Sequence, residues 1–279
     1  MFDFISPLTA VREQAPLVQC ITNFVTVNDC ANIILASGGS PTMSQDIREV
    51  EESVRRANAL VCNMGAIDFT DSMILAGREA NRLGIPVILD PVAAGGTKLR
   101  RETVKRLLEE VNFAVIRGNA SEIRYLAGES STGSGVDVAA EDVITERTIS
   151  TIVQTAESLA ERTGSLIAVS GVFDIITNGT STVVLRNGCA TMARITGSGC
   201  MLTSLIGAFC GCRQQDYFPA VCSAVAAMGV CGELAEERRI KNGTGNATFR
   251  TDLIDAVYSL TEEQLSGGIR YEIYKRSNP

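Results

Sequence analysis

Residues 59–90 read ALVCNMGAIDFTDSMILAGREANRLGIPVILD, and this stretch decides the fold. A short apolar run, Ala59–Asn63, is followed by a helical pattern over Phe69–Leu83 that stops at Gly84. A second apolar run, Pro86–Leu89, comes directly afterwards. Strands that are apolar throughout are buried on both faces, which is typical of a parallel sheet covered by helices. The stretch therefore predicts a β-α-β unit with a right-handed crossover.

The same alternation continues on both sides of this unit. Further strands are predicted at Leu17–Ile21, Phe113–Ile116 and Leu166–Ser170. The predicted helices are 25–37, 47–58, 101–110, 149–163, 198–212, 217–239 and 247–259. Asn178-Gly179 separates two more apolar runs and is a strong hairpin signal, so an antiparallel edge is expected. The prediction is an α/β fold with a mostly parallel central sheet, and, since no linker or repeat is found, one domain over residues 1–279.

The composition removes several mechanisms at once. The 279 residues include no His and nine Cys, and the formal net charge is −7. Without His, neither Ser-His-Asp nor Cys-His hydrolysis nor a His-ligated zinc site is possible. The acidic balance, with no basic stripe, argues against nucleic-acid binding.

The cysteines and the apolar stretches predict a cytoplasmic protein that is not embedded in a membrane. No pair of Cys has C-x-x-C spacing, and the N-terminus does not resemble a secretory signal. We therefore expect reduced thiols, most of them buried. The uncharged stretches Ile195–Cys212 and Tyr217–Gly232 fall short of a membrane span and predict interior helices.

Polar residues and glycines follow each predicted strand. In an open parallel sheet, ligands bind beyond the carboxyl ends of the strands. The residues at those ends are Thr22, Asn23, Asn63, Gly65, Asp90, Arg117, Gly118, Asn119, Ser170 and Gly171. Together they predict a ligand crevice, although each alone fits an ordinary loop.

Two of these strand ends carry charged residues with alternative roles. Asp90 fits either a Mg²⁺ site, usually bound through water, or a turn before Pro91. Asn119 and Glu122 fit a helix capping box, and Glu122 equally fits a metal site. Arg117, between a buried strand and a glycine, is suited to clamping a polyphosphate.

The segment Thr196–Cys200 (TGSGC) opens a helix of small residues. Such loops bind anions through free backbone N–H groups and the helix dipole. The same field is expected to lower the pKa of Cys200 and to favour its thiolate. The alternative is a tight turn with a buried Cys. A second Gly- and Ser-rich segment, Gly128–Asp137, predicts a surface loop that is either a flap or a simple connector.

These residues occur within longer matches to a known family. The sequence resembles the hydroxyethylthiazole kinase family of the ribokinase-like superfamily, in the family's order and over nearly the whole chain. The matching stretches are PLVQCITNFVTVNDCAN (16–32), GGSPTMS (38–44), PVILDPVAAGG (86–96), AVIRGNASEI (114–123) and ITGSGCMLTSLIGAF (195–209). The resemblance implies a three-layer ribokinase-like fold. It also implies a homotrimer with active sites between subunits.

The resemblance implies an ATP- and Mg²⁺-dependent kinase that phosphorylates the hydroxyl of 4-methyl-5-(2-hydroxyethyl)thiazole in thiamine salvage. The implied ATP contacts are Arg117, Ser170, Asn119 and Gly199. The implied thiazole contacts are Met43, Gly197 and Asn23, and Asp90 and Glu122 are assigned to the metal and phosphates. Cys200 stands where most sugar kinases of the superfamily have an Asp base. It is interpreted either as a modest base or as a residue that shapes the anion hole.

Three alternatives remain at this stage. The nearest is another small-alcohol kinase of the superfamily, acting on a hydroxymethylpyrimidine or pyridoxal-type substrate. A second is a Cys-dependent hydrolase or transferase with Cys200 as nucleophile, which lacks a His to assist it. A third is a non-catalytic binding or sensor protein.

Overall fold

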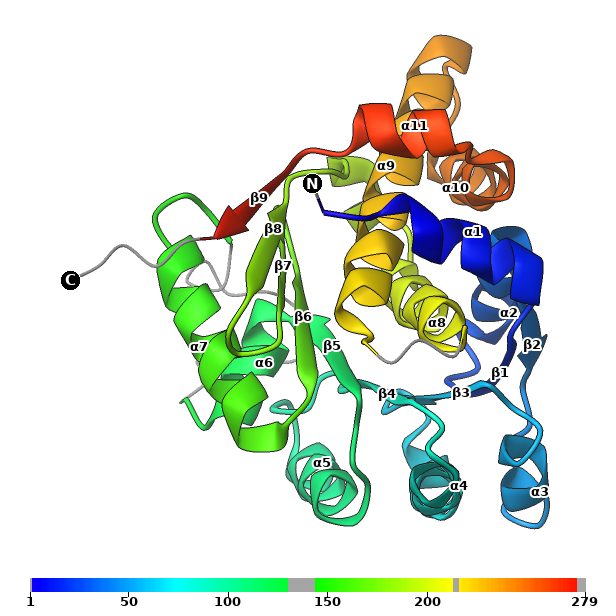
Figure 1. The fold of residues 1–279 in the computed structure, drawn as a ribbon, viewed down its shortest axis with the longest axis vertical. Coiled ribbons are helices and arrows are strands. Elements are labelled where there is room, and N and C mark those ends of the chain that lie inside the picture. The colour runs from blue at the N-terminus through cyan, green and yellow to red at the C-terminus, as the bar shows by residue number, and fades with distance from the viewer. Residues whose placement is uncertain (1, 130–143, 213–215, 275–279) are drawn as a thin grey trace.

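The central sheet runs through the whole molecule (Figure 1). The computed structural model describes residues 2–129, 144–212 and 216–274. Within these ranges nine strands pair in the order β2-β1-β3-β4-β5-β6-β7-β8-β9. The strands are β1 Leu17–Ile21, β2 Ser40–Thr42, β3 Ala59–Asn63, β4 Val87–Asp90, β5 Val115–Asn119, β6 Leu166–Ser170, β7 Asp174–Thr177, β8 Thr182–Leu185 and β9 Tyr271–Tyr274. Strands β1 to β6 are parallel and β7 to β9 add an antiparallel edge. The mostly parallel sheet and the antiparallel hairpin β7–β8 were predicted, whereas β2 and β9 were not.

Helices cover both faces of the sheet and make three layers (Figure 1). The helices are α1 Ile5–Gln14, α2 Val27–Ser37, α3 Val50–Val54, α4 Thr70–Leu83, α5 Lys98–Glu110, α6 Ala120–Ala127, α7 Ile149–Thr163, α8 Ser198–Cys210, α9 Phe218–Asn242, α10 Asn246–Ser259 and α11 Glu262–Gly268. Helices α1, α2, α8, α9 and α10 share one apolar core with the sheet, and α3 to α7 share the other.

The alternation of side chains along each strand explains why the strands are apolar throughout. On β3, Ala59 and Val61 join the core beneath α8, whereas Leu60 and Cys62 join the core on the α4 face. Successive side chains of a strand point to opposite faces, so a sheet covered on both sides needs apolar residues at every position. The two cores therefore fix the register of the strands and the places where they end.

The long apolar helix α9 belongs to the interior. It is the one helix among the described residues that is long and apolar enough to cross a membrane, and 83% of its apolar window is buried. It packs against α8, α10 and the antiparallel strands β7 and β8. This confirms the prediction that the uncharged stretch is a packed interior helix.

Some predicted boundaries differ from the structure. The predicted helix 47–58 is reduced to α3, five residues long. Strand β5 runs to Asn119, so Arg117 lies within a strand and not after it. Only helices were predicted after residue 198, so strand β9, which pairs with β8, was missed. Residues 130–137 of the predicted surface loop lie outside the described residues.

Candidate active site

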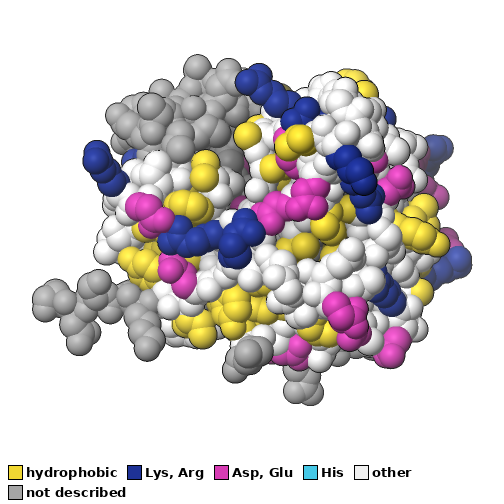
Figure 2. Space-filling view, turned by 90° about the horizontal axis from the view of Figure 1, so that it is seen from above, with side chains coloured by type: hydrophobic (Ala, Val, Ile, Leu, Met, Phe, Trp, Pro, Cys, Tyr) yellow, Lys and Arg dark blue, Asp and Glu magenta, His cyan; other side chains and the backbone are white. Residues whose placement is uncertain are grey.

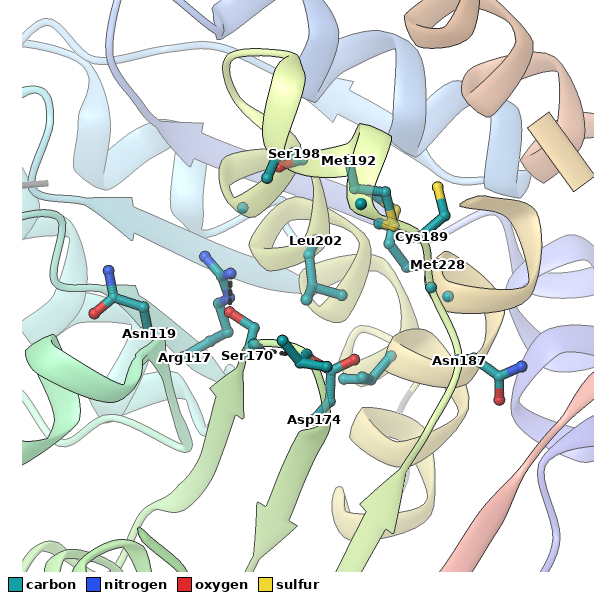
Figure 3. Close-up of a pocket in the computed structure, with 18 residues that line it drawn as sticks. Arg117, Asn119, Ser170, Asp174, Asn187, Cys189, Met192, Ser198, Leu202 and Met228 are labelled. Atoms are coloured by element: carbon teal, nitrogen blue, oxygen red, sulfur yellow. Dashed lines mark hydrogen bonds between the residues drawn. The ribbon is translucent and has the colours of Figure 1, made fainter. Parts of the chain in front are cut away.

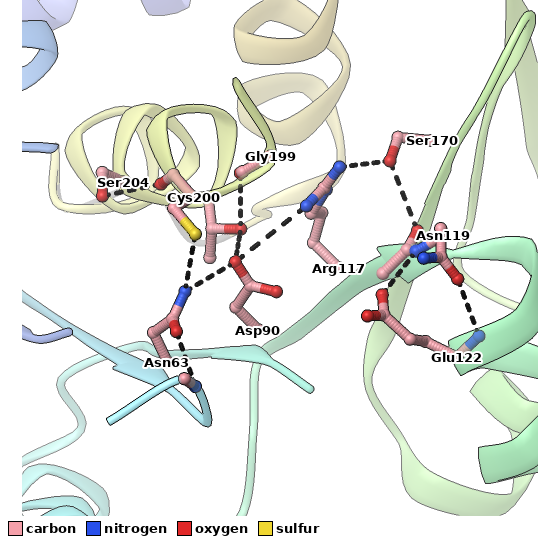
Figure 4. A network of polar contacts seen from close by, with 12 residues as sticks. Asn63, Asp90, Arg117, Asn119, Glu122, Ser170, Gly199, Cys200 and Ser204 are labelled. Carbon is pink, nitrogen blue, oxygen red and sulfur yellow. Dashed lines mark hydrogen bonds and ion pairs between the residues drawn. The ribbon is translucent and has the colours of Figure 1, made fainter. Parts of the chain in front are cut away.

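The carboxyl ends of the parallel strands meet where α8 begins. In the register of the sheet, Asn63 on β3 is level with Asp90 on β4. Asn119 on β5 is level with Ser170 on β6. The first turn of α8 lies beside these strand ends (Figure 4). The structure therefore brings together residues from five separate elements, as the strand-end argument predicted.

The entry into α8 depends on a glycine. Gly197 is the N-cap residue and has φ 83°, a left-handed conformation that favours glycine. A Cβ atom built on it would lie 2.5 Å from Cγ2 of Thr26. The first intrahelical bond runs from the N–H of Met201 to the carbonyl of Gly197, at 2.8 Å. The N–H groups of the residues between them have no partner within the helix, so they are available to an anion.

Asp90 is the centre of a buried polar network (Figure 4). Its Oδ2 accepts hydrogen bonds from Nδ2 of Asn63 at 2.9 Å and from Oγ1 of Thr203 at 3.0 Å. An Arg117 nitrogen lies 4.0 Å from the same oxygen. Asp90 is only 1% exposed, and burial raises its pKa although Arg117 and the hydrogen bonds act in the opposite direction. A charge kept in such a place needs partners, and these three residues supply them.

Cys200 joins this network through its sulfur atom. Nδ2 of Asn63 lies 3.2 Å from the Sγ atom, and Nδ2 of Asn23 lies 3.6 Å from it. Burial, and next the negative charge of Asp90, raise the pKa of Cys200 to about 12. The expectation that the helix N-terminus would lower this pKa is therefore wrong, because burial and a neighbouring carboxylate outweigh the helix dipole. At neutral pH the group is a thiol.

The guanidinium of Arg117 lies against Gly199 in the first turn of α8. It donates a hydrogen bond to the Ser170 hydroxyl, while its Nε atom is buried without a partner among the described residues. A Cβ atom on Gly199 would collide with the guanidinium. The close approach of a cation to the first turn of α8 thus requires glycine at position 199. Arg117 and the free N–H groups make one anion-binding site.

Glu122 forms the predicted capping box with Asn119. The Asn119 side chain accepts a hydrogen bond from the N–H of Glu122, and Oε2 of Glu122 accepts one from the N–H of Asn119. The other oxygen, Oε1, accepts a hydrogen bond from the N–H of Ala93 at 2.8 Å. Burial, and next the charge of Asp90, raise the pKa of Glu122 to about 7. Both of its oxygens therefore already hold backbone groups in place.

These two carboxylates fit one kind of metal site. No cluster of three or more Cys, Asp or Glu that could enclose a metal occurs among the described residues. The two buried carboxylates are close enough for the charge of Asp90 to raise the pKa of Glu122. Mg²⁺ is commonly bound by one or two carboxylates together with water and substrate phosphates. The residues present fit a cation that arrives with a nucleotide, and they do not fit an all-protein cage.

A cavity of about 500 Å³ extends from this polar site (Figure 3). Its lining includes Arg117, Asn119, Ser170, Ser198 and Gly199 from the polar site. It also includes the apolar side chains Met192, Leu202, Val225 and Met228. A ligand with an anionic part and a flat apolar part would match this mixed lining.

The predicted thiazole contacts are only partly brought together. Asn23 donates a hydrogen bond to Oδ1 of Asn63 at 3.2 Å, and Gly197 lies against Thr26. Met43 lies just beyond β2, is partly buried and packs against the α8-side core. Beside it, the side chain of the buried Gln19 donates a hydrogen bond to the carbonyl of Ser44. No hydrogen bond described in the structure links the Met43 loop with Cys200.

Sequence reasoning missed several residues of this site. Thr203 has no motif of its own and enters only because one turn of α8 places it over Asp90. Most of the apolar lining of the cavity comes from α8 and α9, where the sequence shows core residues and nothing more. Asn63 appeared among the strand ends but was not assigned a role. Helical spacing from Gly199 could have indicated Thr203, and no signal was available for Val225 or Met228.

The chain resembles one family of known proteins over nearly its whole length. The family model described as the Hydroxyethylthiazole kinase family matches residues 8–263. The chain is 45% identical over 269 residues to the hydroxyethylthiazole kinase of Clostridium acetobutylicum, covering 96% of this chain and 98% of that one. It is also 45% identical over 263 residues to the hydroxyethylthiazole kinase of Desulfovibrio desulfuricans, covering 91% and 92%.

Solved structures give the same result. The structure of the hydroxyethylthiazole kinase protein from Pyrococcus horikoshii matches with a TM-score of 0.85 and 32% identity, covering 98% of this chain and 99% of that one. An ADP complex of Bacillus subtilis pyridoxal kinase matches with a TM-score of 0.59 at 13% identity, covering 77% and 90%. The second match shows a shared fold alone.

Proposed function

Because the chain belongs to the hydroxyethylthiazole kinase family, we propose that it transfers the terminal phosphoryl group of ATP to the hydroxyl of 4-methyl-5-(2-hydroxyethyl)thiazole in thiamine biosynthesis or salvage. The observation that carries this proposal is the position of Arg117 against Gly199 at the start of α8. A guanidinium and free helix N–H groups that converge on one point are what a transferring phosphoryl group requires.

In the proposed reaction, positioning and charge stabilisation do most of the work. The phosphates of ATP lie in the cavity against Arg117, Ser170, Asn119 and Gly199. The thiazole alcohol lies on the other side of Cys200, against Asn23 and Gly197, with Met43 at the edge of its pocket. The N–H groups of residues 198–200 hold the transferring oxygens, and Arg117 balances the charge that spreads over them.

A Mg²⁺ ion is part of the proposal, and Asp90 and Glu122 are the residues that would hold it. When bound, the ion would neutralise negative charge on the phosphates. The support for this choice is chemical: both carboxylates are buried, are close to each other and lie beside the anion-binding site. Three residues of the chain favour the ionised form of Asp90. Asn63 and Thr203 donate hydrogen bonds to its carboxylate, and the positive charge of Arg117 faces it.

Cys200 is proposed to shape the site and not to act as a base. With a pKa of about 12, the thiol holds its proton throughout the neutral range. In a loose transition state the alcohol loses its proton late, so the reaction does not require a strong base. We predict that Cys200→Ala keeps kcat within about tenfold of wild type, and that the wild-type rate has no thiol titration between pH 7 and 9. Steady-state kinetics across that range measures both. A hundredfold fall in Cys200→Ala that Cys200→Asp restores would instead make residue 200 a base.

The direct test of the proposed function is ADP release with the thiazole alcohol as acceptor. Hydroxymethylpyrimidine and pyridoxal serve as comparison acceptors, because the pyridoxal-type alternative shares the fold. We expect the thiazole alcohol to have the highest kcat/KM of the three. Preference for either comparison acceptor would reassign the substrate, and release without an acceptor would indicate a simple ATPase.

We also propose a homotrimer whose active sites lie between subunits. Phe24 and Val25, directly after Asn23, are 89% and 55% exposed. Large apolar side chains beside a substrate pocket suit a surface that a second subunit covers. Light scattering tests the assembly, and a fully active monomer would contradict it.

We also propose a cytoplasmic location and a single domain. All nine Cys are free and most are buried, which suits the reducing environment of the cytoplasm. Basic and acidic side chains are interspersed on the face shown in Figure 2, so that face has no basic stripe for a nucleic acid. One continuous sheet supports a single domain over residues 1–279.

A further inference from the structure

Asp174, the first residue of β7, lines the cavity and has no part in the reaction described above. It is partly buried, and its Oδ1 atom accepts a hydrogen bond from the N–H of Gly171 at 3.2 Å. This is the one hydrogen bond to its carboxylate from the described residues. A carboxylate has two oxygens and room for further donors. The side chain therefore keeps acceptor capacity inside the cavity.

The position of Asp174 along the cavity is informative. Figure 3 shows Arg117, Ser170 and Asp174 in that order across the view, with Leu202 above them. In the same view Met228 and Asn187, which also line the cavity, lie farther from Arg117 than Asp174 does. Asp174 thus lies past the phosphate-binding residues, on the side where the nucleoside part of a nucleotide would extend.

The chemistry of the group excludes some roles. A carboxylate only accepts hydrogen bonds and repels phosphate oxygens, so it does not bind the phosphates itself. The structural contact with the N–H of Gly171 uses Oδ1, and it leaves Oδ2 without a hydrogen-bond donor among the described residues. Burial raises the pKa of Asp174 to about 7, with the Gly171 N–H and Arg117 acting against it. The charged form has the Gly171 N–H as its one hydrogen-bond donor among the described residues, and a further donor on a ligand would stabilise it.

We propose that Asp174 is a specificity-determining residue for the nucleotide: it accepts a hydrogen bond from an N–H or O–H donor of the nucleoside part. Two groups of ATP have this chemistry, which are the hydroxyls of the ribose and the exocyclic amine of the base. The proposal rests on the proposed function, because it takes the cavity as the ATP site. Sites that hydrogen-bond a ligand group discriminate strongly against analogues that lack it.

The experiment compares ATP, 2′-deoxyATP, 3′-deoxyATP and inosine triphosphate, which has a carbonyl in place of the amine. Wild type is compared with Asp174→Asn, with Asp174→Ala and with Asp71→Asn, an exposed acid on α4 outside the cavity that serves as control. KM and kcat are measured with saturating thiazole alcohol. Binding of each nucleotide is measured separately by calorimetry without acceptor. Thermal unfolding checks that each variant is folded.

We expect wild type and Asp71→Asn to prefer ATP over at least one analogue by about tenfold or more in KM, since a charged hydrogen bond is lost with that analogue. In Asp174→Asn that preference should fall to within about threefold, with kcat and the KM for the thiazole alcohol little changed. The analogue whose KM approaches that of ATP in Asp174→Asn identifies the donor, either a ribose hydroxyl or the exocyclic amine.

Asp174→Asn separates recognition from scaffolding. Its carbonyl oxygen can keep the bond from Gly171, while its NH₂ group replaces the acceptor in the cavity. If Asp174→Asn keeps the ATP preference, or if wild type does not discriminate among the four nucleotides, the inference is overturned. Absence of thiazole phosphorylation by wild type would refute the proposed function instead, and the calorimetric comparison would still decide the role of Asp174.

Discussion

Replacing Arg117 by alanine is expected to lower kcat/KM for ATP by about 10³-fold, since an arginine that stabilises a transferring phosphoryl group is worth roughly 10³ to 10⁵ in rate. Arg117 is 9% exposed and lies against Gly199 at the start of α8. Its charge cannot be replaced by a neighbour, since the groups that it faces are the Ser170 hydroxyl and the Asp90 carboxylate. The loss should appear in both kcat and the KM for ATP.

Arg117→Lys is the matched control. It keeps the positive charge beside Asp90 but lacks the planar fork that contacts two groups at once, so an intermediate loss is expected. Steady-state kinetics with varied ATP, together with calorimetric binding of ADP, measures the effect. If Arg117→Ala has wild-type kinetics for ATP, Arg117 is not part of the phosphate site.

Asp90→Asn is the second large effect, with kcat expected to fall by roughly 10² to 10³-fold, the range found when one group that stabilises transition-state charge is removed. The amide oxygen can still accept from Asn63 and Thr203, so the polar network keeps its acceptor. Removing one partner of a buried ion pair leaves the other charge without compensation, so the thermal stability is expected to fall. We therefore expect a folded but less stable and nearly inactive protein.

The measurement for Asp90→Asn has two parts. Turnover is titrated with Mg²⁺ in wild type and variant, and a higher Mg²⁺ requirement in the variant supports the proposed metal role. Thermal unfolding of both proteins is compared at the same pH. Unchanged turnover at every Mg²⁺ concentration would contradict the role given to Asp90, and a large loss of stability would make the kinetic effect uninformative about chemistry.

The sequence alone predicted the parallel part of the sheet well, because a strand buried on both faces leaves a direct composition signal. Ala59–Asn63 was predicted with its observed bounds, and Leu166–Ser170 likewise. The capping box of Asn119 and Glu122 was also correct, since both partners lie within one turn of each other. Local patterns predict local structure, and these features are local.

The errors have the opposite origin. β9 is a strand because it pairs with β8, nearly ninety residues earlier in the chain, and its own short sequence does not require this. The pKa of Cys200 was predicted from its place at a helix N-terminus, whereas burial and Asp90 decide it. Thr203 and Asp174 were missed for the same reason, because their roles depend on what the fold places opposite them.

The order of the strands has a consequence for how the protein is made. From β3 onwards each strand is added at the same edge of the sheet, so the sheet can grow as the chain leaves the ribosome. One face of β1, β3 and β4 is covered by α8, which begins only at Ser198. We therefore expect the apolar side chains on this face to stay exposed to solvent until α8 has been synthesised. Nascent chains that stop before α8 should bind chaperones, and those that include α9 should be released.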